Sequence, residues 1–189
     1  MSPFKNMSPL VKVPLKYSLV GGVLIIVLLS VLYNFGDHPL LIPIHLDVRV
    51  FIFLLFIYFS VREYKNYYNG GYLHFWQGLT VGVLFYLSVG VLLALFVWIF
   101  ASVSEGFLDG YIEGAIRGME LKKEELMSGP KVKLSPEEFE TQKQNVLQTT
   151  PGLLAIDSFL KTCIIGFFMP VLFAVLLRKT ESQPLAGKL

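Results

Sequence analysis

Residues 78–102 read GLTVGVLFYLSVGVLLALFVWIFAS and determine the fold class. They carry no formal charge, and they belong to a charge-free run that extends from Asn66 to Ser104. A helix of this length crosses the roughly 30 Å hydrocarbon core of a bilayer. Trp76 and Trp98 bracket the segment at the spacing of the aromatic belts that lie at membrane surfaces. The stretch therefore predicts a transmembrane helix.

The composition of the whole chain agrees with a membrane protein. Of the 189 residues, 54% are hydrophobic and only 16% are charged, whereas soluble domains carry about a quarter charged residues. The single cysteine, Cys163, excludes a disulfide scaffold. A net charge of +2 without a basic patch predicts no nucleic-acid partner. We expect one membrane domain over residues 1–189, surrounded by the lipid bilayer, and no cofactor.

Three further spans are predicted. The first lacks a signal-peptide cleavage site after its apolar run, so we expect an uncleaved helix. The second is irregular, because only the 12 residues from Val50 to Val61 are uncharged and a full crossing must begin several residues earlier. The four predicted spans are about residues 17–34, 42–61, 78–102 and 157–177.

The distribution of lysine and arginine predicts the orientation. The short inner segments are basic, whereas most outer basic residues lie in one long loop, which counts weakly in the positive-inside rule. Both termini are therefore expected in the cytoplasm, with residues 178–189 as a flexible tail. Residues 103–152 are expected outside as a small helical cap between the third and fourth spans. The predicted fold class is an all-α, polytopic membrane bundle of four transmembrane helices with this extracytoplasmic cap.

The outer loop carries a glycine stripe in a segment whose helical periodicity extends from Ser104 to Met127. The glycines recur at every fourth position, as Gly106, Gly110, Gly114 and Gly118. Each glycine inside a helix costs roughly 1 kcal/mol relative to alanine, and close approach of another helix is the usual compensation. The alternative is a frayed helix without a partner. A charged stripe, expected to face solvent or a cationic partner, runs alongside through Glu105, Asp109, Glu113 and Arg117.

The rest of the outer loop contains a break and a second short helix. Gly129-Pro130 predicts the break. Ser135-Pro136-Glu137-Glu138 has the pattern of a capping box with proline at the first helical position, and it predicts a helix to about Leu147. Thr150-Pro151-Gly152 is expected to end this region before the last span.

Small residues within the third span predict close helix packing. Gly78, Gly82 and Gly90 are spaced so that a neighbouring helix can approach the backbone. Packing within the same chain is the simpler use of these residues, and a seam between two copies of the chain is the alternative.

Four charged residues are predicted at similar depth near the outer leaflet, namely Asp47, Arg49, Asp157 and Lys161. Ionisable groups within spans are costly, so each is a functional candidate by default. Asp157 and Lys161 also have the i, i+4 spacing of a helical ion pair. We favour structural ion pairs over a functional role, because the positions lie near the surface rather than at the midplane.

Two histidines of the first outer loop, His38 and His45, stand near acidic residues and raise the question of a metal site. Their spacing matches no recognised zinc pattern, and Pro39 and Pro43 constrain the loop. We therefore predict no metal ligand, and the single cysteine adds no alternative.

The stretch from residue 62 to 78, between the second and third spans, is basic and aromatic. Asn69-Gly70 is typical of a tight turn, and the aromatic side chains suit the lipid headgroup layer. The simplest interpretation is a turn with interfacial anchors.

The same stretch resembles the bacterial four-helix membrane family known as domain of unknown function 4199. The resemblance is carried by the order of spans and, most specifically, by Asn69, Gly70, Gly71, Phe75 and Gln77. This chain departs from the family pattern at His74 and Trp76, where small residues are commoner. The resemblance implies a protein of the bacterial inner membrane, but it implies neither an activity nor catalytic residues.

The function favoured by these features is that of an assembly or interaction protein, because the costly features are packing features. Its partner would be a second copy of the chain or another membrane protein. The alternative is a small transporter or channel that uses the four charged residues near the outer leaflet. An intramembrane enzyme ranks last, because no catalytic set of residues is visible.

Overall fold

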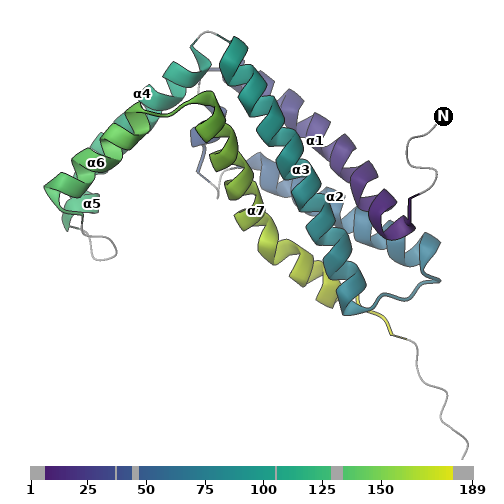
Figure 1. The fold of residues 1–189 in the computed structure, drawn as a ribbon. Coiled ribbons are helices and arrows are strands. Elements are labelled where there is room, and N and C mark those ends of the chain that lie inside the picture. Colours follow the sequence, from purple (N-terminus) through teal and green to yellow (C-terminus); the bar gives the residue numbers. More distant parts are fainter. Residues whose placement is uncertain (1–6, 37, 44–46, 105, 129–133, 181–189) are drawn as a thin grey trace, which may run out of the picture. The chain divides into compact units, whose positions relative to one another are not determined.

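The computed structural model describes residues 7–36, 38–43, 47–104, 106–128 and 134–180. Its only strand-like pairing within these ranges is one bridge between Leu73 and Lys179, so the predicted all-α class is confirmed. The helical elements, most of them labelled in Figure 1, are α1 (Pro9–Asn34), η1 (Pro39–Leu41), α2 (Val48–Glu63), η3 (Tyr64–Tyr68), α3 (Phe75–Val103), α4 (Phe107–Leu121), α5 (Lys123–Ser128), α6 (Pro136–Leu147) and α7 (Pro151–Leu176).

Three helices are long and apolar enough to cross a membrane. α1 has 26 residues, α3 has 29 and α7 has 26. At about 1.5 Å per residue, each is long enough for a hydrocarbon core of about 30 Å. Large apolar side chains are exposed along all three helices, as a lipid-facing surface requires; examples are Val20, Val27, Leu95, Ile99, Ile164 and Phe167. These helices indicate a membrane protein.

The helix of the second predicted span begins later than the expected start of the span near residue 42. α2 begins at Val48 and has 16 residues, so it is about 24 Å long. The segment before it contains the 3₁₀ turn η1, which starts at Pro39. Pro43 disfavours a helical conformation for Ile42, whose backbone is extended. Residues 44–46, which include His45, lie outside the described part of the chain.

The last long helix begins earlier than predicted. α7 starts at Pro151 rather than near residue 157, because proline is well suited to the first helical position. The hydroxyl of Thr150 accepts a hydrogen bond from the backbone N–H of Leu153 at 3.3 Å. Thr150-Pro151-Gly152 therefore begins α7 instead of ending the outer loop. α1 likewise begins earlier than predicted, at Pro9.

The chain forms two compact units, where the sequence predicts one domain. Unit 1 contains Met1–Ile25, Val48–Leu92 and Phe159–Leu189, and unit 2 contains Ile26–Asp47 and Leu93–Ser158. Each of the three long helices contributes residues to both units. The candidate sites described below lie within one unit or the other.

In unit 1, small residues of α3 allow close approach of α7. A Cβ atom built on Gly82 would lie 2.6 Å from the Cβ and 2.9 Å from the Cα of Pro170. A Cβ on Gly78 would lie 3.0 Å from the Cα of Ala174, and one on Gly90 would lie 3.0 Å from the ring of Phe159. The three glycines singled out in the sequence therefore contact α7 of the same chain.

Unit 2 has an aromatic core at the junction of α3 and α4. The ring of Phe107, which is only 2% exposed, lies 5.1 Å from the ring of Tyr33 and 4.9 Å from that of Phe100, measured between centroids. α6 packs on α4 and buries Phe139. α4 and α6 are thus folded against each other within unit 2, although α4 to α6 are largely polar on the outside.

The segment predicted as one helix from Ser104 to Met127 is divided. Gly106 has a φ of +84°, a left-handed conformation that favours glycine, and it precedes α4 instead of lying within it. α4 ends at Leu121, and the short helix α5 follows. Glu105 and the predicted break at Gly129-Pro130 lie outside the described residues.

The capping box predicted at Ser135 is confirmed. The hydroxyl of Ser135 accepts a hydrogen bond from the backbone N–H of Glu138 at 3.2 Å, and the carboxylate of Glu138 accepts one from the backbone N–H of Ser135 at 2.8 Å. These hydrogen bonds lower the pKa of Glu138 below its ordinary value. The box fixes the start of α6, whose last residue is Leu147 as predicted.

Candidate functional site

The loop between α2 and α3 is held by a network of polar contacts in unit 1. α2 ends in one π-helical turn, η3, and the backbone N–H of Gly71 then donates to the carbonyl of Lys65 at 2.9 Å. The ammonium group of Lys65 donates to the carbonyl of Leu177, just beyond α7, at 2.9 Å. Since single π-helical turns are frequent at functional sites, this turn directs attention to its surroundings.

Asn69 and Gln77 are the centre of this network. The side-chain amide of Asn69 donates to the carbonyl of Tyr72 at 2.7 Å and to Oε1 of Gln77 at 2.9 Å. Oε1 of Gln77 also accepts from the backbone N–H of His74 at 3.0 Å. The structure therefore brings two of the residues that carry the family resemblance into direct contact, and both shape the turn before α3.

The other residues of the resemblance complete the same turn. Gly70 and Gly71 have φ values of +61° and +84°, which lets the chain reverse between Asn69 and Tyr72. Phe75 is half-buried, and its ring lies 5.3 Å from the ring of Trp76. This loop pattern thus has a structural explanation in the geometry of the turn.

The turn is also tied to the end of α7. Leu73, whose side chain is fully buried, exchanges two backbone hydrogen bonds with Lys179, of 2.8 and 3.0 Å. The ammonium group of Lys179 lies 5.8 Å from the centroid of the Tyr72 ring. Residues 178–180, predicted to begin a flexible tail, are therefore ordered; residues 181–189 lie outside the described part of the chain.

We expect the Gln77→Leu variant to lose about 1–3 kcal/mol of unfolding free energy, because leucine removes the acceptor of the His74 N–H and one of the two acceptors of the Asn69 amide. Thermal unfolding of the purified protein measures this effect. The Trp76→Leu variant is the matched control, since the neighbouring Trp76 side chain is exposed. Equal stability of the two variants would contradict a structural role for this network.

A charged cluster in unit 1 connects α1 with the end of α2. The hydroxyl of Tyr17 donates to Oε2 of Glu63 at 2.7 Å, and the ammonium group of Lys16 forms an ion pair with the same oxygen. The Lys16 ammonium also lies 4.6 Å from the centroid of the Tyr17 ring. The Glu63 side chain is only 18% exposed, so these two donors satisfy a partly buried carboxylate.

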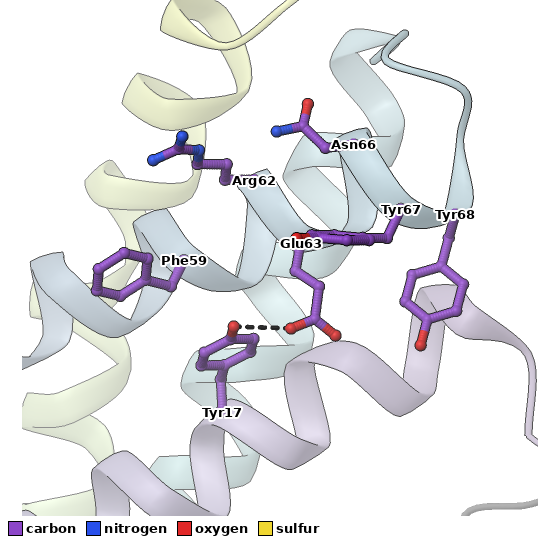
Figure 2. A pocket seen from close by; sticks show the side chains of 7 residues that line it. All are labelled: Tyr17, Phe59, Arg62, Glu63, Asn66, Tyr67 and Tyr68. Atoms are coloured by element: carbon purple, nitrogen blue, oxygen red, sulfur yellow. Dashed lines mark hydrogen bonds between the residues drawn. The ribbon is translucent and has the colours of Figure 1, made fainter.

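A cavity of about 510 Å³ lies beside this cluster, and Figure 2 shows its lining. The lining combines aromatic rings with polar and charged groups, and comes from α1, α2 and η3. The lining residues are Tyr17, Phe59, Arg62, Glu63, Asn66, Tyr67 and Tyr68. Such a combination suits an amphipathic ligand at a membrane surface.

A second cavity, of about 680 Å³, lies in unit 2 between residues 33–43 and α4. Gly110 and Gly114 of the glycine stripe line it, together with the charged side chains of Glu113 and Arg117. A Cβ atom built on Gly114 would lie 2.5 Å from Cδ1 of Leu41, whereas Gly118 has no atom within 4 Å of such a Cβ. The middle of the predicted stripe therefore contacts the chain's own η1 segment, and its end at Gly118 is open.

His38 connects η1 with the start of α4. Its Nε2 lies 3.0 Å from the carbonyl oxygen of Phe107, and its Nδ1 accepts from the backbone N–H of Leu40 at 3.4 Å. Because a carbonyl only accepts, these contacts indicate the neutral ring with its proton on Nε2. Burial lowers the pKa of His38 below its ordinary value of 6.5, and the hydrogen bond to Phe107 offsets part of that shift. No group of three or more His, Cys, Asp or Glu residues that could hold a metal ion occurs among the described residues.

We expect unit 2 to lose stability as the pH falls below 6.5. The folded chain binds the His38 proton less readily than the unfolded chain does, so stabilisation that is complete above pH 6.5 is lost as the pH falls toward the folded-state pKa. Hydrogen exchange of α4 between about pH 5 and 7 measures this loss. His38→Gln should flatten the pH dependence, and replacement of the exposed His74 by Gln should not. A slope that is unchanged in His38→Gln would contradict the assignment.

The four charged residues expected near the outer leaflet are distributed over both units. Asp47, which is 5% exposed, precedes α2 in unit 2, and Arg49 is the second residue of α2 in unit 1. Asp157 and Lys161 lie one turn apart on α7. Each of the four has an interaction partner, so none is an isolated charge.

Two groups of contacts were not predicted from the sequence. The first is the cluster of Lys16, Tyr17 and Glu63; its only sequence signal is one acid within the basic segment that follows the second apolar run. The second is the packing of Tyr33 and His38 on Phe107, which joins residues far apart in the chain.

The family described as Protein of unknown function (DUF4199) matches residues 16–179 of this chain. The chain belongs to this family. The match includes the Asn69–Gln77 turn and residues of both units, so the family pattern covers the two candidate sites. No curated protein and no solved structure matches the chain. The family description supplies no activity, so a function must be argued from the geometry.

Proposed function

We propose that this protein is an integral membrane protein of the bacterial inner membrane that acts by binding another protein, without catalysing a reaction. The observation that carries the proposal is the fold of the segment between α3 and α7. The described part of this segment contains α4, α5 and α6, buries Phe107 and Phe139, and has an ion pair of 2.7 Å between Lys143 and Glu120. A simple connection between two spans needs no such structure, so we assign the segment a role in recognition.

We infer four crossings, with both termini in the cytoplasm. The first part of α1 belongs to unit 1, and the end of α1 and η1 belong to unit 2. All of α2 belongs to unit 1 again. Within unit 1, Tyr17 near the start of α1 contacts Glu63 at the end of α2. This order supports α2 as a return crossing, and a short helix is accommodated by local thinning of the bilayer. The basic residues near this contact favour the cytoplasmic side.

The proposed contact surface is the open end of the glycine stripe on α4. Glu113 and Arg117 are exposed there, and both line the cavity of unit 2. Gly118 follows with open space around it. The partner is a second copy of the chain or another membrane protein, since a small-residue surface with flanking charges suits helix packing.

The test is crosslinking in cells of the native host, followed by purification in mild detergent and mass spectrometry. We expect a stoichiometric partner or a dimer crosslinked through α4, and a loss of about tenfold in complex on Arg117→Glu, equivalent to about 1.4 kcal/mol. Lys122→Glu is the matched control, because Lys122 is exposed but does not line the cavity. A lone monomer from wild-type cells, or a complex unaffected by Arg117→Glu, would contradict the proposal.

Gly118→Leu tests the glycine stripe better than changes at Gly110 or Gly114. Leucine at position 114 would collide with Leu41 of the same chain, so loss of a complex could follow from misfolding. Leucine at position 118 has room within the chain, and it should disrupt only packing with a partner. An unchanged complex in Gly118→Leu would exclude this end of the stripe from the interface.

The second candidate function is a small transporter or channel, which is favoured by the burial of Asp47. Asp47 is only 5% exposed just before α2, and an ionisable group at the edge of a proposed span is a functional candidate by default. In this case Asp47→Asn should abolish solute flux into vesicles while the protein remains folded. Retained flux in this variant would reject the candidate.

A further inference from the structure

α2 presents an exposed apolar stripe that leads to the polar cavity of unit 1. The stripe consists of large side chains at three- or four-residue spacing, which places them on one face of the helix. Its members are Val48, Phe51, Leu55 and Phe59. Phe59 also lines the cavity, next to Arg62 and Asn66. Phe59 and Arg62 are three residues apart on α2 and both line the cavity (Figure 2), so the apolar stripe continues into the polar end.

The polar end of this surface is suited to an anion. The Arg62 guanidinium donates one hydrogen bond, to the hydroxyl of Tyr58 at 3.3 Å, and keeps its other N–H donors. Within the described part of the chain, the side chains of Asn66, Tyr67 and Tyr68 donate to no other group. The nearby carboxylate of Glu63 is already neutralised by Lys16. The cavity therefore offers one uncompensated cation and several hydrogen-bond donors.

We propose that this surface binds an anionic phospholipid, with its phosphodiester group against Arg62 and Asn66 and an acyl chain along Phe59, Leu55 and Phe51. A guanidinium recognises phosphate through paired N–H donors, and basic sites at the ends of membrane helices bind anionic headgroups. Phe51 and Phe59 are two helical turns apart, about 12 Å, which an acyl chain within one leaflet of about 15 Å can follow. A choline headgroup would instead place a second cation beside Arg62.

The test is native mass spectrometry of the full chain, purified in detergent and offered equal amounts of phosphatidylglycerol and phosphatidylcholine. We expect phosphatidylglycerol to be retained about tenfold more than phosphatidylcholine, the effect of one charge-assisted contact. Arg62→Gln should remove most of this preference. Lys122→Gln removes one charge between α4 and α5 of unit 2 and should leave the preference unchanged.

Three results would overturn the proposal. The first is equal retention of the two lipids by the wild-type protein, a comparison that depends on no variant. The second is an unchanged preference in Arg62→Gln, whose exposed side chain can be replaced without disturbing a core. The third is displacement of phosphatidylglycerol by millimolar inorganic phosphate, which would show that the ligand is a soluble anion. Persistence of the bound lipid in phosphate is the expected result.

Discussion

Replacement of Gly82 by leucine lowers the unfolding free energy by about 2–3 kcal/mol. An added Cβ would lie 2.6 Å from the Cβ of Pro170 and 2.9 Å from its Cα, and a proline ring and backbone cannot move aside as a flexible side chain can. Leucine also has a higher helix propensity than glycine, which stabilises α3 by about 1 kcal/mol, and the stated net loss already includes this gain. We expect a fall of about 5–10 °C in the unfolding midpoint, measured in detergent.

The matched control for Gly82→Leu is Gly152→Leu, the same change in the first turn of α7. A Cβ at Gly152 would meet no atom within 4 Å. We therefore expect the midpoint of Gly152→Leu to stay within a few degrees of the wild type. Equal midpoints for the two variants would show that α3 and α7 do not approach each other closely at Gly82.

Replacement of Phe107 by alanine has an even larger expected effect, about 3–5 kcal/mol. The Phe107 ring is 2% exposed and packs against Tyr33, Phe100 and His38, so alanine leaves a cavity at the start of α4. We expect much faster hydrogen exchange throughout α4, measured by mass spectrometry.

The control for Phe107→Ala is Leu121→Ala, at the other end of α4. The Leu121 side chain is 81% exposed, so its truncation removes no buried contact. We expect exchange in α4 to remain as in the wild type. Exchange that stays slow in Phe107→Ala would contradict the aromatic core of unit 2.

Much of the fold could be predicted from the sequence because the spans depend on local composition. The predicted span at residues 78–102 corresponds to α3, which is longer by three residues at the start and one at the end. α2 was harder to predict, because charged residues interrupt the apolar sequence at its start and the helix begins only at Val48. A count of charges does not give the first residue of such a helix, because tertiary contacts also determine where a helix begins.

The candidate sites were less predictable because they join distant residues. The pairing of Tyr17 with Glu63 spans more than forty positions, and neither residue has unusual neighbours in the sequence. The Asn69–Gln77 turn, by contrast, is local, and a family resemblance pointed to it. The glycine stripe was recognised as a packing feature, but its contact with Leu41 of η1 depends on tertiary structure.

Cysteine labelling tests most directly whether α4 to α6 are displayed opposite the Asn69–Gln77 turn. The native Cys163 is replaced by alanine, and single cysteines are placed at Leu121, 81% exposed, and at Tyr67, 83% exposed. These sites are separated by α3, so they fall on opposite sides of the membrane if α3 crosses it. We expect a membrane-impermeant maleimide to label Leu121→Cys in intact cells and Tyr67→Cys only after permeabilisation. Labelling of both sites in intact cells would contradict α3 as a span, and labelling of Leu121→Cys only after permeabilisation would contradict the display of α4 to α6 outside the membrane.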